Sequence, residues 1–146
     1  MTPSRSIGPA DSYIRFYEAM SPETVDTLPD VASPDIHFCD PFNDVIGIEA
    51  YRKLLAKMFE TVPDARFTVS HQAVDDDTCF MRWRMTATLR GAPWVVEGMS
   101  ELRFAPDGKV REHIDYWDAA AQFYEKFPII GAAIRAIRRR VARAHQ

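Results

Sequence analysis

The hydrophobic period of the chain changes near residue 65, and this change constrains the fold more than any other feature. Before it, apolar side chains recur at the helical spacing i, i+3, i+4 and i+7: Tyr13, Phe16, Tyr17 and Met20. After it, apolar and polar residues alternate along four segments: 66–74, 78–89, 94–104 and 109–117. Short turns join these segments, and consecutive strands joined in this way pair antiparallel. The order predicts an α+β fold in which a cone-shaped, curved antiparallel sheet wraps round N-terminal helices, with a C-terminal helix.

Local signals predict the remaining elements. Asp11 or Ser12 is expected to cap the first helix, and a turn is expected over 90–93. A third helix carries one apolar stripe and ends at Pro63; the stripe is Tyr51, Leu54, Leu55, Met58 and Phe59. The other expected segments are a loose tail over 1–9, an irregular helix over 23–31, a strand over 35–42 and an amphipathic helix over about 118–144, interrupted near Pro128 and Gly131. We expect a single domain over residues 10–146.

Charge and cysteine content restrict the partners and the compartment. Five arginines lie in the last eighteen residues, which contain no Asp or Glu: Arg135, Arg138, Arg139, Arg140 and Arg143. Removing these five charges from the formal net charge of −3 leaves −8 for residues 1–128. Such an acidic body repels phosphate backbones, so we expect no nucleic-acid partner. Two cysteines without a CxxC pair, and an N-terminus without an apolar secretory core, predict a cytoplasmic protein.

The alternation in the meander predicts which side chains face inward. In segment 78–89 the apolar set is Cys79, Met81, Trp83, Met85, Ala87 and Leu89. In segment 94–104 the expected inward set is Trp94, Val96, Gly98, Ser100, Leu102 and Phe104. The last segment has no cleanly apolar face, and if Trp117 points inward then His113 and Asp115 do so as well. Titratable groups on an inward face are costly unless they are paired, so they are candidates for function.

Two motifs carry a resemblance to a known family. The first is FCDPFNDVIG (38–47), which precedes a helix, and the second is GKVREHIDYWD (108–118), which ends the meander. With this element order, nearly the whole chain resembles the SnoaL-like, nuclear-transport-factor-2-like superfamily. That superfamily includes ketosteroid isomerases, limonene epoxide hydrolases and polyketide cyclases. The resemblance implies a curved sheet round one apolar pocket.

The resemblance also implies roles for single residues. Compared with ketosteroid isomerase, Asp40 falls at the general base. The two oxyanion-hole donors of that family fall at Phe16, beside Tyr17, and near Ser100, which departs from its pattern. Compared with limonene epoxide hydrolase, HIDYWDAAAQFYEKFP (113–128) is similar to the end of the family, and Asp115 falls on one catalytic carboxylate. The other would fall at Arg84 and turn it inward, whereas the apolar alternation places Arg84 outward. SnoaL-like cyclases similarly use an aspartate acid/base, which Asp115 could supply.

We therefore assign Asp115 as candidate acid or base, His113 as its partner, and Asp40 as a second base or positioning group. The candidate substrate-binding residues are Phe16, Tyr17, Tyr51, Phe59, Trp83, Met85, Ser100 and Trp117. The alternatives are a structural network for His113 and Asp115, a turn role for Asp40, and a plain core for the aromatics. The histidines show no ligand spacing, so we expect no metal, and we expect no cofactor.

These residues leave three hypotheses for function. The first is a cofactor-free isomerase, cyclase or hydrolase that acts on a small hydrophobic compound. The second is a protein that binds a hydrophobic ligand without turnover, and the third is a dimerisation module. We expect a homodimer, because the outward sheet face carries Val95 and Met99. For the amphipathic C-terminal helix we favour docking on the body or on a dimer partner over attachment to a membrane surface or to another anionic partner.

Overall fold

The structure is a computed structural model that describes residues 8–144. Contacts between residues divide the chain into two compact units, residues 1–116 and 117–146, and we describe each unit by itself. The expectation of one domain over residues 10–146 stays a prediction. Residues 1–7 of the expected tail lie outside the described residues, and Pro9 already begins the first helix.

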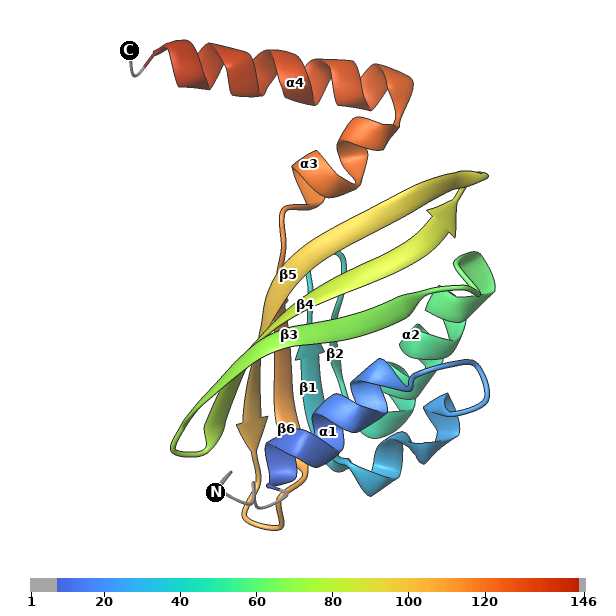
Figure 1. Ribbon diagram of the computed structural model, residues 1–146, viewed down its shortest axis with the longest axis vertical. Helices are drawn as coiled ribbons and strands as arrows, with labels where there is room; N and C mark the ends of the chain where they lie inside the picture. The colour runs from blue at the N-terminus through green and yellow to red at the C-terminus, as the bar shows by residue number, and fades with distance from the viewer. Residues whose placement is uncertain (1–7, 145–146) are drawn as a thin grey trace, which may run out of the picture. The chain divides into compact units, whose positions relative to one another are not determined.

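The first unit is built on a six-stranded curved, unclosed sheet with the strand order β2-β1-β6-β5-β4-β3 (Figure 1). Its strands are β1 (Ala32–Cys39), β2 (Asp44–Ile46), β3 (Arg66–Asp75), β4 (Thr78–Leu89), β5 (Ala92–Phe104) and β6 (Val110–Tyr116). The four-stranded meander β3 to β6 is antiparallel, as predicted. The sheet is not antiparallel throughout, because β1 pairs parallel with β6. The predicted α+β fold, with a curved sheet and helices before it, is confirmed.

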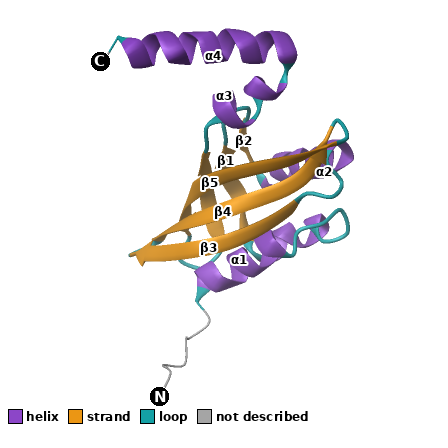
Figure 2. Ribbon diagram, turned by 45° about the horizontal axis from the view of Figure 1, so that its top comes forward, coloured by secondary structure: helices purple, strands orange, loops and turns teal. Residues whose placement is uncertain are grey.

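Three helices lie on one side of this sheet (Figure 2). They are α1 (Pro9–Glu18), the 3₁₀-helix η1 (Val25–Asp30) and α2 (Ile48–Thr61). Helix α1 begins earlier than predicted, because Pro9 occupies its first position and Gly8 caps it in place of Asp11 or Ser12. The Asp11 carboxylate instead accepts the Gly8 N–H at 3.1 Å. The irregular helix predicted over 23–31 is the 3₁₀ turn η1, which contains Pro29.

The predicted alternation in the meander places the core. Along β4, Cys79, Met81, Trp83 and Met85 are buried, while the intervening residues face outward. In β5, Trp94, Val96, Ser100 and Leu102 are buried. Arg84 is exposed and lies 3.7 Å from the outward Glu97 carboxylate, so the alternation predicts its side correctly and the comparison with limonene epoxide hydrolase does not. Val95 and Met99 are exposed on the outer face, and a homodimer through that face stays a prediction.

Two predicted boundaries are wrong, for identifiable reasons. The expected turn over 90–93 contains only Arg90 and Gly91, which both have positive φ as a tight hairpin requires. Pro93 is tolerated in β5 because β6 pairs only with residues 99–104 of that strand. The strand expected over 35–42 starts and ends earlier, at Ala32 and Cys39, because a turn at 40–43 leads into β2, which we did not predict.

The second unit contains α3 (Ala119–Gln122), the 3₁₀-helix η2 (Tyr124–Lys126) and α4 (Pro128–Arg143). The predicted interruption is real, but Pro128 starts a helix there and Gly131 lies inside it. Strand β6 ends at Tyr116, one residue before its predicted end at Trp117, and an inward place for the Trp117 side chain stays a prediction. Over residues 8–144, no helix has the length and apolar character needed to cross a membrane.

Ile36 and Ile46 offer a matched test of where the core lies. Ile36 in β1 is 0% exposed, whereas Ile46 in the edge strand β2 is 73% exposed. We expect Ile36→Ala to lower the free energy of unfolding by about 2–5 kcal/mol, because it leaves a cavity. Ile46→Ala should change it by no more than about 0.5 kcal/mol. Urea unfolding followed by circular dichroism measures both, and equal losses would contradict this placement of the core.

Candidate active site

Strands β4, β5 and β6 bring one cluster of polar side chains to the inner face of the sheet. His113 and Asp115 lie two residues apart on β6 and therefore share a face. Ser100 of β5 is the cross-strand partner of Asp115, and β4 brings Trp83 beside them. The His113 side chain is 0% exposed, and that of Asp115 is 10% exposed. His113 and Asp115 therefore share one inward face, as the period of two requires.

Hydrogen-bond donors converge on one oxygen of Asp115. The Trp83 indole N–H donates to Ser100 Oγ at 2.8 Å. Because an indole N–H can only donate, the Ser100 hydroxyl is left to donate its own proton, and it does so to Asp115 Oδ1. His113 Nε2 lies 2.6 Å from the same Oδ1. Two side chains therefore hold Asp115 Oδ1 in place.

The other nitrogen of His113 meets two buried tyrosines. Tyr13 Oη of α1 lies 2.6 Å from His113 Nδ1, and Tyr51 Oη of α2 lies 3.3 Å from Tyr13 Oη and 3.4 Å from the same Nδ1. Burial raises the pKa of both tyrosines above the usual range, so both keep their protons. Tyr13 can then donate to Nδ1, which leaves the imidazole proton on Nε2, facing Asp115. Tyr13 of α1, Tyr51 of α2 and His113 of β6 therefore belong to one hydrogen-bond network that ends at Asp115.

Aromatic rings enclose His113. The ring centroids of Phe38, Tyr13, Tyr17 and Tyr51 lie between 5.1 and 6.1 Å from the imidazole. Since the His113 side chain has no exposed surface, it acts on a ligand only through Asp115. His113 is therefore a positioning residue for the carboxylate.

Asp115 is the accessible member of this network. Both of its hydrogen bonds end on Oδ1, and the described residues donate none to Oδ2. Residues 8–144 contain no fully buried side-chain oxygen or nitrogen that lacks a hydrogen-bond partner. Because Oδ2 has no donor, it is therefore not fully buried. A carboxylate with one oxygen fixed and the other unoccupied can accept a proton or a hydrogen bond from a ligand.

Asp40 lies beside Asp115 but is engaged in a turn. The parallel register pairs Phe38 with His113 and Cys39 with Ile114, so Asp40 and Asp115 occupy the next positions on the same face. Asp40 Oδ1 accepts the backbone N–H groups of Phe42 at 2.8 Å and Asn43 at 2.7 Å. Partial burial, and to a lesser extent the charge of Asp115, raise the pKa of Asp40. Asp40 therefore has the turn role that was its alternative, and its part in a pocket shared with Asp115 stays a prediction.

The other predicted substrate-binding residues divide by location. Trp83, Met85 and Ser100 lie on the buried inner face of the sheet, and Tyr17, Tyr51 and Phe59 are buried on the helices. Phe16 is half-buried on α1, and Trp117 belongs to the second unit. Trp83, Ser100 and Tyr51 have hydrogen bonds in the Asp115 network. Whether these side chains bind a substrate stays a prediction.

Sequence reasoning missed the role of Tyr13. We placed it on the apolar stripe of the first helix, and it is in fact the nearest partner of His113 Nδ1. The signal was present, because a buried tyrosine hydroxyl and an inward histidine each need a polar partner. Their spacing in the sequence, however, gives no indication that they meet.

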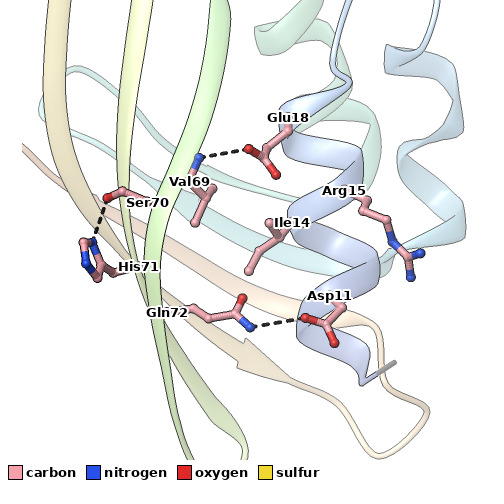
Figure 3. Close-up of a pocket in the computed structure, with 8 residues that line it drawn as sticks. All are labelled: Asp11, Ile14, Arg15, Glu18, Val69, Ser70, His71 and Gln72. Atoms are coloured by element: carbon pink, nitrogen blue, oxygen red, sulfur yellow. Dashed lines mark hydrogen bonds between the residues drawn. The ribbon is translucent and has the colours of Figure 1, made fainter. Parts of the chain in front are cut away.

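A separate groove of about 550 Å³ lies between α1 and the edge strand β3 (Figure 3). Glu18 accepts the Val69 N–H at 3.1 Å across it, and Gln72 donates to Asp11 at 3.2 Å. These bonds occupy part of the exposed edge of β3. Asp40, His113 and Asp115 do not line this groove, so it is distinct from the candidate site. Within residues 8–144, no group of three or more His, Cys, Asp or Glu side chains could hold a metal ion.

A family model described as a SnoaL-like domain matches residues 13–113. A search of the curated proteins found no match. The matched segment runs from Tyr13 in α1 to His113 in β6, the two residues whose side chains meet at 2.6 Å.

Solved structures share the fold at low identity. A protein assigned as a SnoaL-like polyketide cyclase from Jannaschia sp. CCS1 is 21% identical, with a TM-score of 0.68 over 77% of this chain and 87% of that one. A protein with a ketosteroid isomerase-like fold from Catenulispora acidiphila, solved with trimethylamine, is 15% identical (TM-score 0.66, 84% and 91% covered). An epoxide hydrolase of M. tuberculosis, similar to limonene epoxide hydrolase, is 15% identical (TM-score 0.65, 79% and 84%). At these identities the likeness shows the fold alone.

The raised pKa of Asp40 gives two variants with opposite expected effects. Asp115→Asn removes a negative charge that raises the pKa of Asp40, so this pKa should fall. Asn43→Ala removes a hydrogen bond that lowers it, so the pKa should rise. Because the pKa of Asp40 is higher in the folded protein than in the unfolded chain, the protonated carboxyl stabilises the fold. This stabilisation is complete below the unfolded pKa and is lost as pH rises through the folded pKa. Carboxyl-detected NMR titration measures each pKa. If the pKa of Asp40 does not change in Asp115→Asn, the two carboxylates do not interact.

Tyr13→Phe directly tests the hydrogen bond between the Tyr13 hydroxyl and His113 Nδ1. Without the hydroxyl, His113 Nδ1 keeps only the long contact to Tyr51, and we expect about 1–3 kcal/mol less stability to urea. Tyr116→Phe is the matched control, because its hydroxyl is exposed and donates to Glu101 at 3.4 Å; it should change stability by at most about 0.5 kcal/mol. If the two variants unfold alike, Tyr13 does not support His113.

Proposed function

The chain belongs to the SnoaL-like domain family, and on that premise we propose that it is a cofactor-free enzyme for a small hydrophobic substrate. The reaction class is isomerisation, cyclisation or hydrolysis by carboxylate acid/base chemistry. Asp115 is the proposed catalytic residue, with His113 and Ser100 as positioning residues. Asp40 is a second carboxylate that can orient a substrate or exchange a proton.

One observation carries this proposal: Asp115 Oδ1 is held by Ser100 and His113, while Oδ2 receives no donor from the described residues. In the proposed step Oδ2 takes a proton from a carbon next to a carbonyl group. The C–H electron pair forms the new carbon–carbon double bond, and the π pair of the carbonyl group moves onto its oxygen. Return of the proton to another position completes an isomerisation, and attack of the enolate carbon on a second carbonyl closes a ring. Positioned acid/base catalysis of this kind contributes roughly 10²–10⁴-fold.

The surroundings of Asp115 favour an apolar substrate. The buried polar or charged residues in the described chain are Ser33, Ser100 and His113. The last two are committed to Asp115, and the half-buried Asp40 is committed to its turn. The inner face thus offers no buried Arg or Lys to neutralise an anionic ligand, whose burial would be costly. A hydrophobic compound with one or two carbonyl groups fits this environment best.

The positions of other residues separate this site from two related ones. The second carboxylate of limonene epoxide hydrolase would fall at Arg84, which is exposed and faces Glu97. The oxyanion-hole donors of ketosteroid isomerase would fall at Phe16, which cannot donate, and near Ser100, which donates to Asp115. The geometry therefore supports proton transfer by one aspartate more than either of these complete mechanisms.

A second candidate function is binding of a hydrophobic ligand without turnover. The completeness of the network favours it, because the Tyr13–His113 bond links α1 to β6 and the Tyr51–His113 contact adds α2. Such links stabilise the fold whether or not Asp115 reacts. Turnover and binding must therefore be measured separately.

Proton exchange provides the test. We expect the protein in D₂O to replace the α-protons of small hydrophobic ketones with deuterium, which ¹H NMR follows without knowledge of the natural substrate. Asp115→Asn should slow this exchange by about 10²–10⁴-fold while saturation-transfer NMR still detects ligand binding. Glu112→Gln, on the same strand, is the control and should exchange at the native rate. Binding without exchange in the native protein would establish the second candidate, and equal rates in Asp115→Asn would exclude Asp115.

A further inference from the structure

Helix α4 has an unusual composition for a surface helix. In Pro128–Arg143 every charged or hydrogen-bonding side chain is an arginine, and there is no Asp or Glu. The arginines are Arg135, Arg138, Arg139, Arg140 and Arg143. Most surface helices mix charges of both signs, which stabilises them through i, i+4 pairs. A helix with positive charge alone is suited to a negatively charged partner.

The apolar residues of α4 form a separate stripe. Ile130, Ile134, Ile137 and Val141 follow one another at i, i+4, i+7 and i+11, which places them on one face of the helix. Arg135, Arg139 and Arg143 lie on the opposite side of the helix, while Arg138 borders the stripe beside Ile134 and Arg140 borders it beside Ile137. The helix is therefore amphipathic, with a polar face made of guanidinium groups.

The contacts within the second unit show which face of α4 is already covered. A Cβ atom on Gly131 would lie 2.5 Å from the Glu125 carbonyl oxygen, so η2 packs closely against that side. Arg135 donates to the same carbonyl at 3.1 Å, and Arg138 donates to the Glu125 carboxylate at 2.5 Å. The unit therefore uses the Gly131 side of α4 for its own packing.

The apolar stripe of α4 is not fully covered within the second unit. Ile137 is 63% exposed and Val141 is 55% exposed, and Ile129 at the start of the helix is 87% exposed. Arg139 and Arg143 have no ion pair among the described residues. Exposed isoleucines next to unpaired arginines combine the two attractions that hold a helix in the headgroup region of a membrane.

We propose that α4 lies in the surface of an anionic lipid bilayer, with its isoleucine face in the acyl boundary and its arginines at the lipid phosphates. The helix is too short and too polar to span the bilayer. A second copy of α4 is a poorer partner, because the arginines that border its stripe, Arg138 and Arg140, would lie near those of the first copy and repel them. Residues 1–128 carry a formal net charge of −8, since the five arginines all lie beyond them in a chain of net charge −3. Anionic lipid repels this part of the chain, so binding depends on α4. Such binding would hold the protein where hydrophobic compounds collect.

Co-sedimentation of the full chain with vesicles tests this proposal. We expect binding to vesicles of phosphatidylcholine mixed with phosphatidylglycerol, weaker binding to phosphatidylcholine alone, and loss of binding as salt is raised. Replacing Arg139, Arg140 and Arg143 with glutamine should weaken binding on the order of a hundredfold. The matched control replaces Arg82, Arg84 and Arg111 of the sheet, removes the same charge and should bind as the native chain does.

A second pair of variants tests the apolar face. Ile137→Gln with Val141→Gln should weaken binding at least about tenfold, because both side chains leave the acyl boundary. Ile46→Gln with Val74→Gln changes two residues of similar exposure outside α4 and should have no effect. Circular dichroism checks that all variants stay folded. Absence of binding to anionic vesicles would overturn the proposal, as would self-association without lipid that Ile137→Gln abolishes, since a second copy would then cover α4.

Discussion

The buried His113 imidazole is the group on which the arrangement of the first unit depends. It has no exposed surface, so each of its two nitrogens needs a partner inside the protein. Nδ1 meets Tyr13 from α1, and Nε2 meets Asp115 on its own strand. A single ring thus links a helix packed on the sheet to the carboxylate of the candidate site. Loss of either partner would leave a buried polar atom unsatisfied, which costs more than the bond itself contributes.

Much of the fold could be predicted because its signals are local. The change of hydrophobic period near residue 65 separates helices from the meander, and alternation alone assigns the inner face of β4 and β5. It even places Arg84 outward, against the rough alignment with the epoxide hydrolases. The boundaries were less accurate where a side chain or turn decides them. Asp40 ends β1 by accepting two backbone N–H groups. Positive φ at Arg90 makes the turn between β4 and β5 shorter than predicted.

The candidate site was only partly predictable, for a physical reason. His113 and Asp115 share a strand, so a period of two brings them to one face. Ser100 and Trp83 join them through cross-strand register, which alternation suggests but does not fix. Tyr13 and Tyr51 come from helices far away in the sequence, and no pattern in the chain indicates that both hydroxyls reach the same nitrogen. Long-range contacts of this kind depend on packing, which spacing does not encode.

The parallel pairing of β1 with β6 has a consequence for how the first unit assembles. The meander grows by hairpins whose strands are neighbours in sequence, so each pairing closes a short loop. The β1–β6 seam joins the first strand to the last and can form only after the chain between them is arranged. Asp40 and Asp115 lie at the end of that seam. The part of the molecule most closely tied to its chemistry therefore depends on the strand pairing that closes the longest loop in the sheet and carries the largest cost in chain entropy.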